Sequence, residues 1–223
     1  EIYMNFINNS KNNFVKQKTL KNNILFSGVG LHTGKAVSMS IEPSEPNTGI
    51  VFERTDLYEN NMIEAIIDNV DETCLCTKIT NKHGVSVSTI EHLMAAFHGL
   101  EIDNVKVKIN SDELPALDGS SYVYVKKIID AGVKFQSVNR KCIKILKRIK
   151  FCLNDRYISA EPSNELSLNI NIDYPNTIIG NSQFTYNHSK SNFLSQLSEA
   201  RTFTLLEDVE KMRLNGYAMG GSL

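Results

Sequence analysis

The sequence has 223 residues, which suits one large domain or two small ones at roughly 100–200 residues per domain. Lys and Arg number 24 against 25 Asp and Glu, and the resulting net charge of -1 excludes a nucleic-acid surface built on bulk positive charge. No run approaches the roughly 20 apolar residues of a transmembrane segment, and no signal peptide is evident. We therefore expect a cytoplasmic protein without a nucleic-acid partner. The four cysteines form no C-x-x-C pair, which predicts free thiols in a reducing compartment.

The first part of the chain indicates short strands. Residues 1–14 are Asn-rich and are expected to form a loose arm, or to precede a true start at Met4. Alternating or β-branched apolar runs then predict strands over residues 19–26, 36–41, 49–54, 62–67, 74–80 and 85–88, with a hairpin turn at 81–84. The segment SGVGLHTG, residues 27–34, has three glycines and indicates a connection whose backbone approaches something closely.

The hydrophobic period then changes. Residues 88–100 and 120–131 have helical patterns, and the alternating segment 102–109 between them predicts a half-buried strand. The pattern restarts near residues 133–140. Strands are expected over 141–152, 156–160, 166–172 and 182–186, followed by helices over 193–197 and 205–214. This repetition predicts two α+β domains, residues 15–134 and 135–223, the second incomplete at its C-terminal end.

Glu91 and His92 form the pair of residues that best suits catalysis. A carboxylate beside an imidazole at the start of a helix fits metal-assisted hydrolysis, with the His as a zinc ligand and the Glu as a base acting on water. The alternative is structural, because Ser88-x-x-Glu91 also fits a capping box. The spacing leaves both interpretations open.

His32 lies in the glycine-rich segment. A His among glycines can reach a phosphate or a substrate, or it can simply fill a turn. SGVGLHTG lacks the G-x-x-x-x-G-K-[ST] pattern of a P-loop, so the segment alone identifies no nucleotide site.

Five motifs in order carry a resemblance to a known family. The segments SGVGLHTGK, ETCLCT, STIEHLMAAFHGLEIDN, ELPALDGSS and ARTF are similar to those of the UDP-3-O-acyl-N-acetylglucosamine deacetylase family, the zinc hydrolases of lipid A biosynthesis. The resemblance runs from about Gln17 to Ser222. It implies two similar α+β domains, each a sheet with helices, packed helix face to helix face. It also implies removal of the N-acetyl group from a UDP-linked acylated amino sugar, with release of acetate.

The resemblance assigns roles to residues of this sequence. It implies that His92 is a Zn²⁺ ligand, that Glu91 is the general base, and that Thr202 hydrogen-bonds the reacting carbonyl. It implies that the substrate is bound by His32, Leu75, Cys76, Asp118, Phe203, Leu206, Val209 and Met212. The last three, together with Leu205, form an apolar stripe where the family builds a tunnel for the acyl chain, although such a stripe can equally be ordinary core.

The resemblance also implies two more zinc ligands, a His and an Asp four residues later, beyond the Gly-Gly-Ser segment. Because the chain ends at Leu223, we expect a C-terminally truncated chain that is inactive alone, and a monomer when complete. The alternative is an inactive fragment or a non-catalytic remnant that binds a nucleotide sugar.

Overall fold

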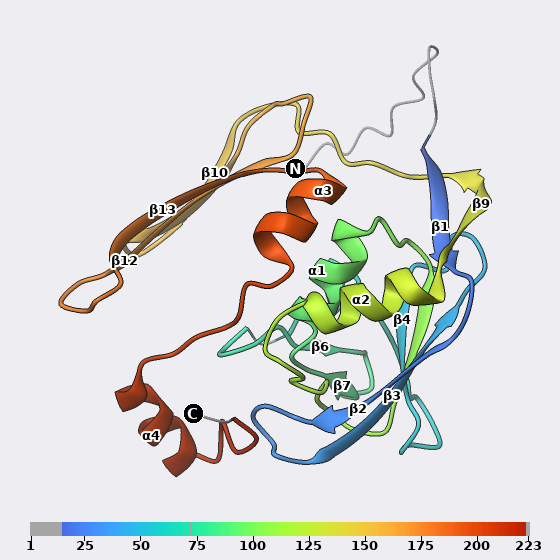
Figure 1. Ribbon diagram of the computed structural model, residues 1–223, viewed down its shortest axis with the longest axis horizontal. Coiled ribbons are helices and arrows are strands. Elements are labelled where there is room, and N and C mark those ends of the chain that lie inside the picture. Colours follow the sequence, from blue (N-terminus) through green and yellow to red (C-terminus); the bar gives the residue numbers. More distant parts are fainter. Residues whose placement is uncertain (1–14, 72, 222–223) are drawn as a thin grey trace. The chain divides into compact units, whose positions relative to one another are not determined.

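The computed structural model describes residues 15–71 and 73–221 (Figure 1). Its described part is mixed α+β with several sheets, which confirms the predicted class. The described residues divide into two compact units, a larger one of Lys16–Asn139 with residues 194–221 and a smaller one of Arg140–Phe193 with Val15. The packing of two domains through their helix faces, and the boundaries at 134 and 135, stay predictions. The expected arm over residues 1–14 and the start at Met4 lie outside the described residues.

A five-stranded sheet forms the centre of the larger unit. Its strand order is β2 (Ile24–Val29), β3 (Ala36–Pro43), β8 (Val105–Ile109), β4 (Ile50–Arg54) and β5 (Met62–Glu64). Neighbouring strands are antiparallel, except that β4 and β8 run parallel. The parallel pair requires a crossover between β4 and β8, and this crossover contains the helix with Glu91 and His92.

One face of this sheet is buried, as the alternating sequence of β8 predicts. Val105, Val107 and Ile109 are fully buried, whereas Lys106 and Lys108 point outward. Those two lysines form ion pairs on the outer face with Glu53 and Glu42. The alternation in a single strand therefore decides which face of the sheet receives the helices.

Helices α1 (Glu91–Gly99) and α2 (Tyr122–Ala131) pack against each other in the larger unit. Leu93 and Phe97 of α1 are fully buried. On α2, the Tyr124 ring lies 5.1 Å from that of Phe26 in β2, which fixes the helix on the sheet. Both helices were expected, and their apolar faces contribute to the core.

Shorter elements complete the larger unit. β1 (Lys16–Leu20) pairs with β9 (Val133–Asn139), and β6 (Ile79–Thr80) pairs with β7 (Ser86–Val87) through the expected turn at 81–84. β5 is followed by the 3₁₀ turn η1 (Ile67–Asn69), and α4 (Leu206–Leu214) lies near the end of the chain. No helix in the described part is long and apolar enough to cross a membrane.

Two strand predictions for this unit were wrong in detail. The run over 19–26 is two strands, β1 and β2, separated by a turn. The expected strand over 74–80 is a strand only at its end, because Leu75 has a left-handed φ of 64°, outside the β region. The strand β9 was not predicted, and it lies where the sequence pattern restarts.

The smaller unit contains two antiparallel hairpins. β10 (Ile149–Leu153) pairs with β11 (Arg156–Ala160), and β12 (Ser167–Tyr174) pairs with β13 (Gly180–Asn187). The expected strand over 141–152 is therefore shorter than predicted and begins at Ile149. A short helix α3 (Lys190–Asn192) follows, and the π-helical turn η2 (Phe193–Leu197) leads back to the larger unit.

Candidate active site

Four segments of the larger unit meet around the start of α1. Gly30 pairs with Pro115 in an antiparallel bridge, and Ser88 pairs with Glu113 in a parallel one. The Ile90 backbone N–H donates to the carbonyl oxygen of Thr77 over 3.4 Å. These contacts bring the glycine-rich loop, the 74–77 loop, the start of α1 and the segment 111–120 together.

Glu91 is the first residue of α1, and it does not complete a capping box. The residue before the helix is Ile90, which makes no side-chain cap, and the Ser88 hydroxyl donates to the carbonyl oxygen of Asp112 over 3.0 Å. Oε2 of Glu91 instead accepts from the backbone N–H of Thr77 at 3.0 Å. The capping interpretation was wrong because both side chains bond to other segments. Oε1 of Glu91 has no hydrogen bond with the described residues.

His92 is half-buried beside Glu91, and its imidazole has no hydrogen-bond partner among residues 15–71 and 73–221. The ring nitrogens are therefore available to a ligand. The described residues nevertheless hold no group of three His, Cys, Asp or Glu side chains that could grip a metal ion. They offer one imidazole with a neighbouring carboxylate, which fits part of a zinc site.

Leu75 and Cys76 lie in the loop that holds Glu91. Leu75 is 51% exposed, and its left-handed backbone turns the loop at that point. Cys76 is half-buried, and burial raises the pKa of its thiol. All four cysteines are free thiols, as predicted.

His32 is held by its backbone and not by its ring. Its N–H donates to Oε1 of Glu113 at 2.8 Å, while both ring nitrogens are buried without a hydrogen-bond partner in the described part of the chain. The edge of the ring contacts Tyr217, with centroids 5.7 Å apart. A buried imidazole that lacks partners is a candidate for binding a ligand.

The segment near the end of the chain closes over the glycine-rich loop. The N–H of Gly220 donates to the carbonyl oxygen of Leu31 at 3.0 Å, and that of Met219 donates to the carbonyl of His32 at 3.3 Å. A Cβ atom on Gly220 would overlap the carbonyl oxygen of Gly30. Gly220 is thus required for the direct contact between these two backbones.

Asp118 and Thr202 lie on neighbouring segments. Oδ1 of Asp118 accepts from the backbone N–H and the hydroxyl of Ser120, at 3.0 and 2.9 Å. The N–H of Thr202 donates to the carbonyl oxygen of Gly119 at 3.0 Å, which brings Thr202 next to the 118–120 turn. Thr202 and Phe203 are both exposed.

The apolar stripe of α4 is separate from these contacts. No residue of α4 is buried, Leu206 is 63% exposed, and Val209 and Met212 are half-buried. No interaction among the described residues joins these three side chains to Glu91 or His92. The ordinary-core alternative for this stripe was therefore wrong in the described structure.

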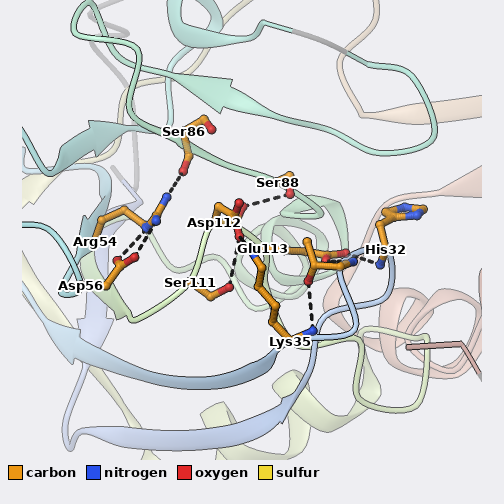
Figure 2. Close-up of polar contacts among 10 residues, drawn as sticks. His32, Lys35, Arg54, Asp56, Ser86, Ser88, Ser111, Asp112 and Glu113 are labelled. Atoms are coloured by element: carbon orange, nitrogen blue, oxygen red, sulfur yellow. Dashed lines mark hydrogen bonds and ion pairs between the residues drawn. The ribbon is translucent and has the colours of Figure 1, made fainter. Parts of the chain in front are cut away.

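Charged side chains lie near the segment 111–113, and Figure 2 shows those of Lys35, Arg54 and Asp56. Arg54 forms a bidentate ion pair with Asp56 at 2.7 and 2.8 Å, and it also donates a hydrogen bond to the carbonyl oxygen of Ser86. This hydrogen-bonded guanidinium holds the pKa of Asp56 below its usual range. Lys35 lies 3.5 Å from Asp112. These charged side chains pair with one another, so their presence requires no ligand.

Comparison with known proteins decides the family. A family model described as UDP-3-O-acyl N-acetylglycosamine deacetylase (LpxC) matches residues 17–223. The chain belongs to this deacetylase family.

Curated members of the deacetylase family are similar over most of the chain. The UDP-3-O-acyl-N-acetylglucosamine deacetylase of Haemophilus influenzae (strain PittEE) is 38% identical over 211 residues, which cover 94% of this chain and 69% of the relative. The proteins of the same name from Actinobacillus succinogenes and Mannheimia succiniciproducens are each 39% identical with the same coverage. The recognised resemblance is thereby confirmed.

Glu113 is a polar residue of this candidate site that sequence reasoning missed. It is fully buried and accepts hydrogen bonds from the glycine-rich loop, as Figure 2 shows for His32, and from the hydroxyl of Thr89. Its signal in the sequence was weak, because an acidic residue in a Ser/Asp-rich loop is normally a solvated one.

Proposed function

We propose that this protein removes the N-acetyl group from a UDP-3-O-acyl-N-acetylglucosamine, a step of lipid A biosynthesis, with the help of zinc. Family membership over residues 17–223 carries the proposal. The adjacent Glu91 and His92 at the start of α1 support it, because within the described part of the chain one carboxylate oxygen of Glu91 and the imidazole of His92 have no hydrogen-bond partner.

His92 would hold the zinc ion. A catalytic zinc site normally takes three protein ligands, so the remaining ligands would come from outside the described residues. When bound, zinc supplies a Lewis acid that polarises the acetamide carbonyl and lowers the pKa of a coordinated water. The half-buried position of His92 supports this role, since the ring is accessible to an ion.

Glu91 would take the proton from the attacking water. The Thr77 N–H holds Oε2 at 3.0 Å and so fixes the carboxylate, while Oε1 remains able to accept a proton. The Thr202 hydroxyl would donate a hydrogen bond to the oxygen on which negative charge develops, a preorganised contact of the oxyanion-hole type. The backbone bond from Thr202 to Gly119 supports a fixed place for this residue.

The two parts of the substrate, the nucleotide sugar and the acyl chain, would contact two separate sets of residues. We assign the nucleotide-sugar part to His32, Leu75, Cys76, Asp118 and Phe203, of which His32 has two buried ring nitrogens in need of partners. The acyl chain would lie on Leu206, Val209 and Met212. The exposure of Leu206 supports this, because a chain of CH₂ groups stabilises the complex by about 0.8 kcal/mol for each group it buries.

The direct test combines zinc binding with acetate release. The purified protein, loaded with Zn²⁺, is incubated with UDP-3-O-acyl-N-acetylglucosamine, and acetate and the free amine are measured. We expect both products from the wild type, and neither product nor tight zinc binding from His92→Ala. His83→Ala is the control, because His83 is an exposed turn residue. Equal zinc affinity in His92→Ala and His83→Ala would contradict the role of His92.

A second candidate function is binding of a nucleotide sugar without hydrolysis. The buried, unpartnered ring nitrogens of His32 favour it, because they suit a phosphate or sugar hydroxyl. Calorimetric titration of the metal-free protein with UDP distinguishes the candidates. Binding that is lost in His32→Ala, in a protein that releases no acetate with zinc, would favour this second function.

A further inference from the structure

Glu113 is a fully buried carboxylate in the segment between β8 and α2. No Lys or Arg among the residues that the structure describes forms an ion pair with it. Burial of an unpaired charge costs several kcal/mol unless hydrogen bonds replace the lost water, so the donors around this side chain must compensate for that cost.

The donors come from two separate segments. Oε1 accepts from the backbone N–H of His32 at 2.8 Å and from the hydroxyl of Thr89 at 3.1 Å. Oε2 accepts from the backbone N–H of Thr33 at 2.8 Å. Figure 2 shows Glu113 beside the His32 loop. One side chain therefore bonds the glycine-rich loop to Thr89, which lies two residues before the first residue of α1.

The glycine-rich loop is shaped to receive this carboxylate. A Cβ atom on Gly30 would overlap Oε2 of Glu113 and would also lie too close to the Thr33 hydroxyl. Only a residue without a side chain lets the loop wrap around the carboxylate at this distance. The two backbone N–H groups that point at it resemble a nest for an anion, occupied here by a side chain of the same protein.

The hydroxyl that donates to Oε1 of Glu113 belongs to Thr89, whose backbone is strained. Thr89 has φ 58°, a left-handed conformation that a β-branched residue rarely adopts, and it is 6% exposed. Such strain persists where surrounding contacts hold it, and it gathers at functional sites. The hydroxyl bond to Glu113 is one of those contacts, two residues before Glu91.

We propose that Glu113 is a positioning residue of the site, a role that rests on the function proposed above. It touches no substrate atom. Its carboxylate sets the His32 loop relative to the start of α1, and so fixes His32 with respect to Glu91 and His92. Because catalysis is sensitive to displacements of about 1 Å, loosening this connection lowers the rate more than it weakens substrate binding.

The test replaces the carboxylate by its neutral isostere. Glu113→Gln keeps the shape of the side chain but turns an NH₂ group toward one of the two loop N–H groups, so one attachment is lost. The control is Glu53→Gln, which removes the carboxylate of the Glu53–Lys106 ion pair on the outer face of the five-stranded sheet. We expect kcat in folded Glu113→Gln to fall tenfold or more with KM changed less than threefold, and the amide NMR signals of His32 and Thr33 to shift. The control should match the wild type in both.

Thr89 provides a second pair of variants should Glu113→Gln fail to fold. Thr89→Val is isosteric and loses only the hydroxyl donor, whereas Thr89→Ser keeps it. We expect kcat to fall severalfold in Thr89→Val and to stay near the wild type in Thr89→Ser. If the Thr89 hydroxyl had a purely structural role, Thr89→Val would have a lower melting temperature, but the two variants would not differ in kcat.

The outcomes separate this proposal from the function on which it rests. Unchanged kcat and unchanged His32 amide signals in folded Glu113→Gln, or equal behaviour of the two Thr89 variants, would overturn the positioning role. If the wild type released no acetate, the proposed function would fail, and the amide signals of His32 and Thr33 alone would then decide the positioning role.

Discussion

The backbone N–H of Thr77 donates to Oε2 of Glu91 over 3.0 Å, and this bond joins the loop of Leu75 and Cys76 to the first residue of α1. A carboxylate at the first helical position can bond to its own helix or to another segment. Here it bonds to another segment through one oxygen only. The bond therefore orients Glu91 and leaves Oε1 for chemistry.

We predict that Glu91→Gln removes most of the deacetylase activity and little stability. The carboxamide oxygen can still accept from Thr77, so the loop stays in place, but the side chain can no longer take a proton. General-base catalysis contributes about 10²–10⁴-fold, and kcat should fall within that range. Steady-state kinetics and thermal unfolding of the same samples measure the two effects. A kcat within threefold of the wild type would show that Glu91 is not the base.

We predict that Gly220→Ala destabilises the larger unit. Its new methyl group would overlap the carbonyl oxygen of Gly30, a backbone atom that cannot rotate away. Overpacking of this kind costs about 1–3 kcal/mol. Gly221→Ala is the matched control, because its methyl group would meet its nearest neighbour at 3.5 Å, an ordinary contact. Urea unfolding of both variants measures the difference, and equal unfolding midpoints would disprove the close contact.

Cys76 should react more slowly than the other cysteines. Burial raises the pKa of its thiol, so less of the reactive thiolate is present at a given pH than at an exposed cysteine. Limited alkylation with iodoacetamide at pH 8, followed by peptide mass spectrometry, compares Cys76 with the exposed Cys74 two residues away. We expect several times slower labelling at Cys76. Faster labelling there would mean that its surroundings stabilise the thiolate.

The sequence predicts the elements of the larger unit that have a clear period. The alternation in β8 and the helical patterns of α1 and α2 each identify an element whose apolar face is buried. The 74–77 loop was mistaken for a strand, since nothing in its composition indicates the left-handed backbone of Leu75. That conformation depends on tertiary contacts, which a local pattern does not contain.

The candidate site was only partly accessible to sequence reasoning. Glu91 and His92 were singled out by residue type, but the spacing alone favoured a capping box, and only the bond to Thr77 decides between a local and a long-range role. Glu113 was missed because its donors, His32, Thr33 and Thr89, are 81, 80 and 24 residues away. Long-range hydrogen bonds of a buried carboxylate leave no periodic signal.

Tyr124 should make the stability of the larger unit fall at alkaline pH. Burial raises the pKa of its hydroxyl above the value of about 10 in an unfolded chain, and the hydroxyl donates to the Pro115 carbonyl at 2.9 Å. Above pH 10 the unfolded chain loses this proton while the folded protein keeps it. The unfolded state is then favoured, so the free energy of unfolding decreases as pH rises through this range.

Tyr124→Phe tests this origin of the alkaline transition. At pH 7 the variant should lose about 1 kcal/mol, because the Pro115 carbonyl loses its donor. From pH 9 to 11, however, its free energy of unfolding should decrease less steeply than that of the wild type, because it has no buried hydroxyl to ionise. Tyr122→Phe, on the exposed side of the same helix, should reproduce the wild-type pH dependence. Guanidinium unfolding at each pH measures the slopes, and parallel curves for Tyr124→Phe and the wild type would rule out Tyr124 as the group responsible.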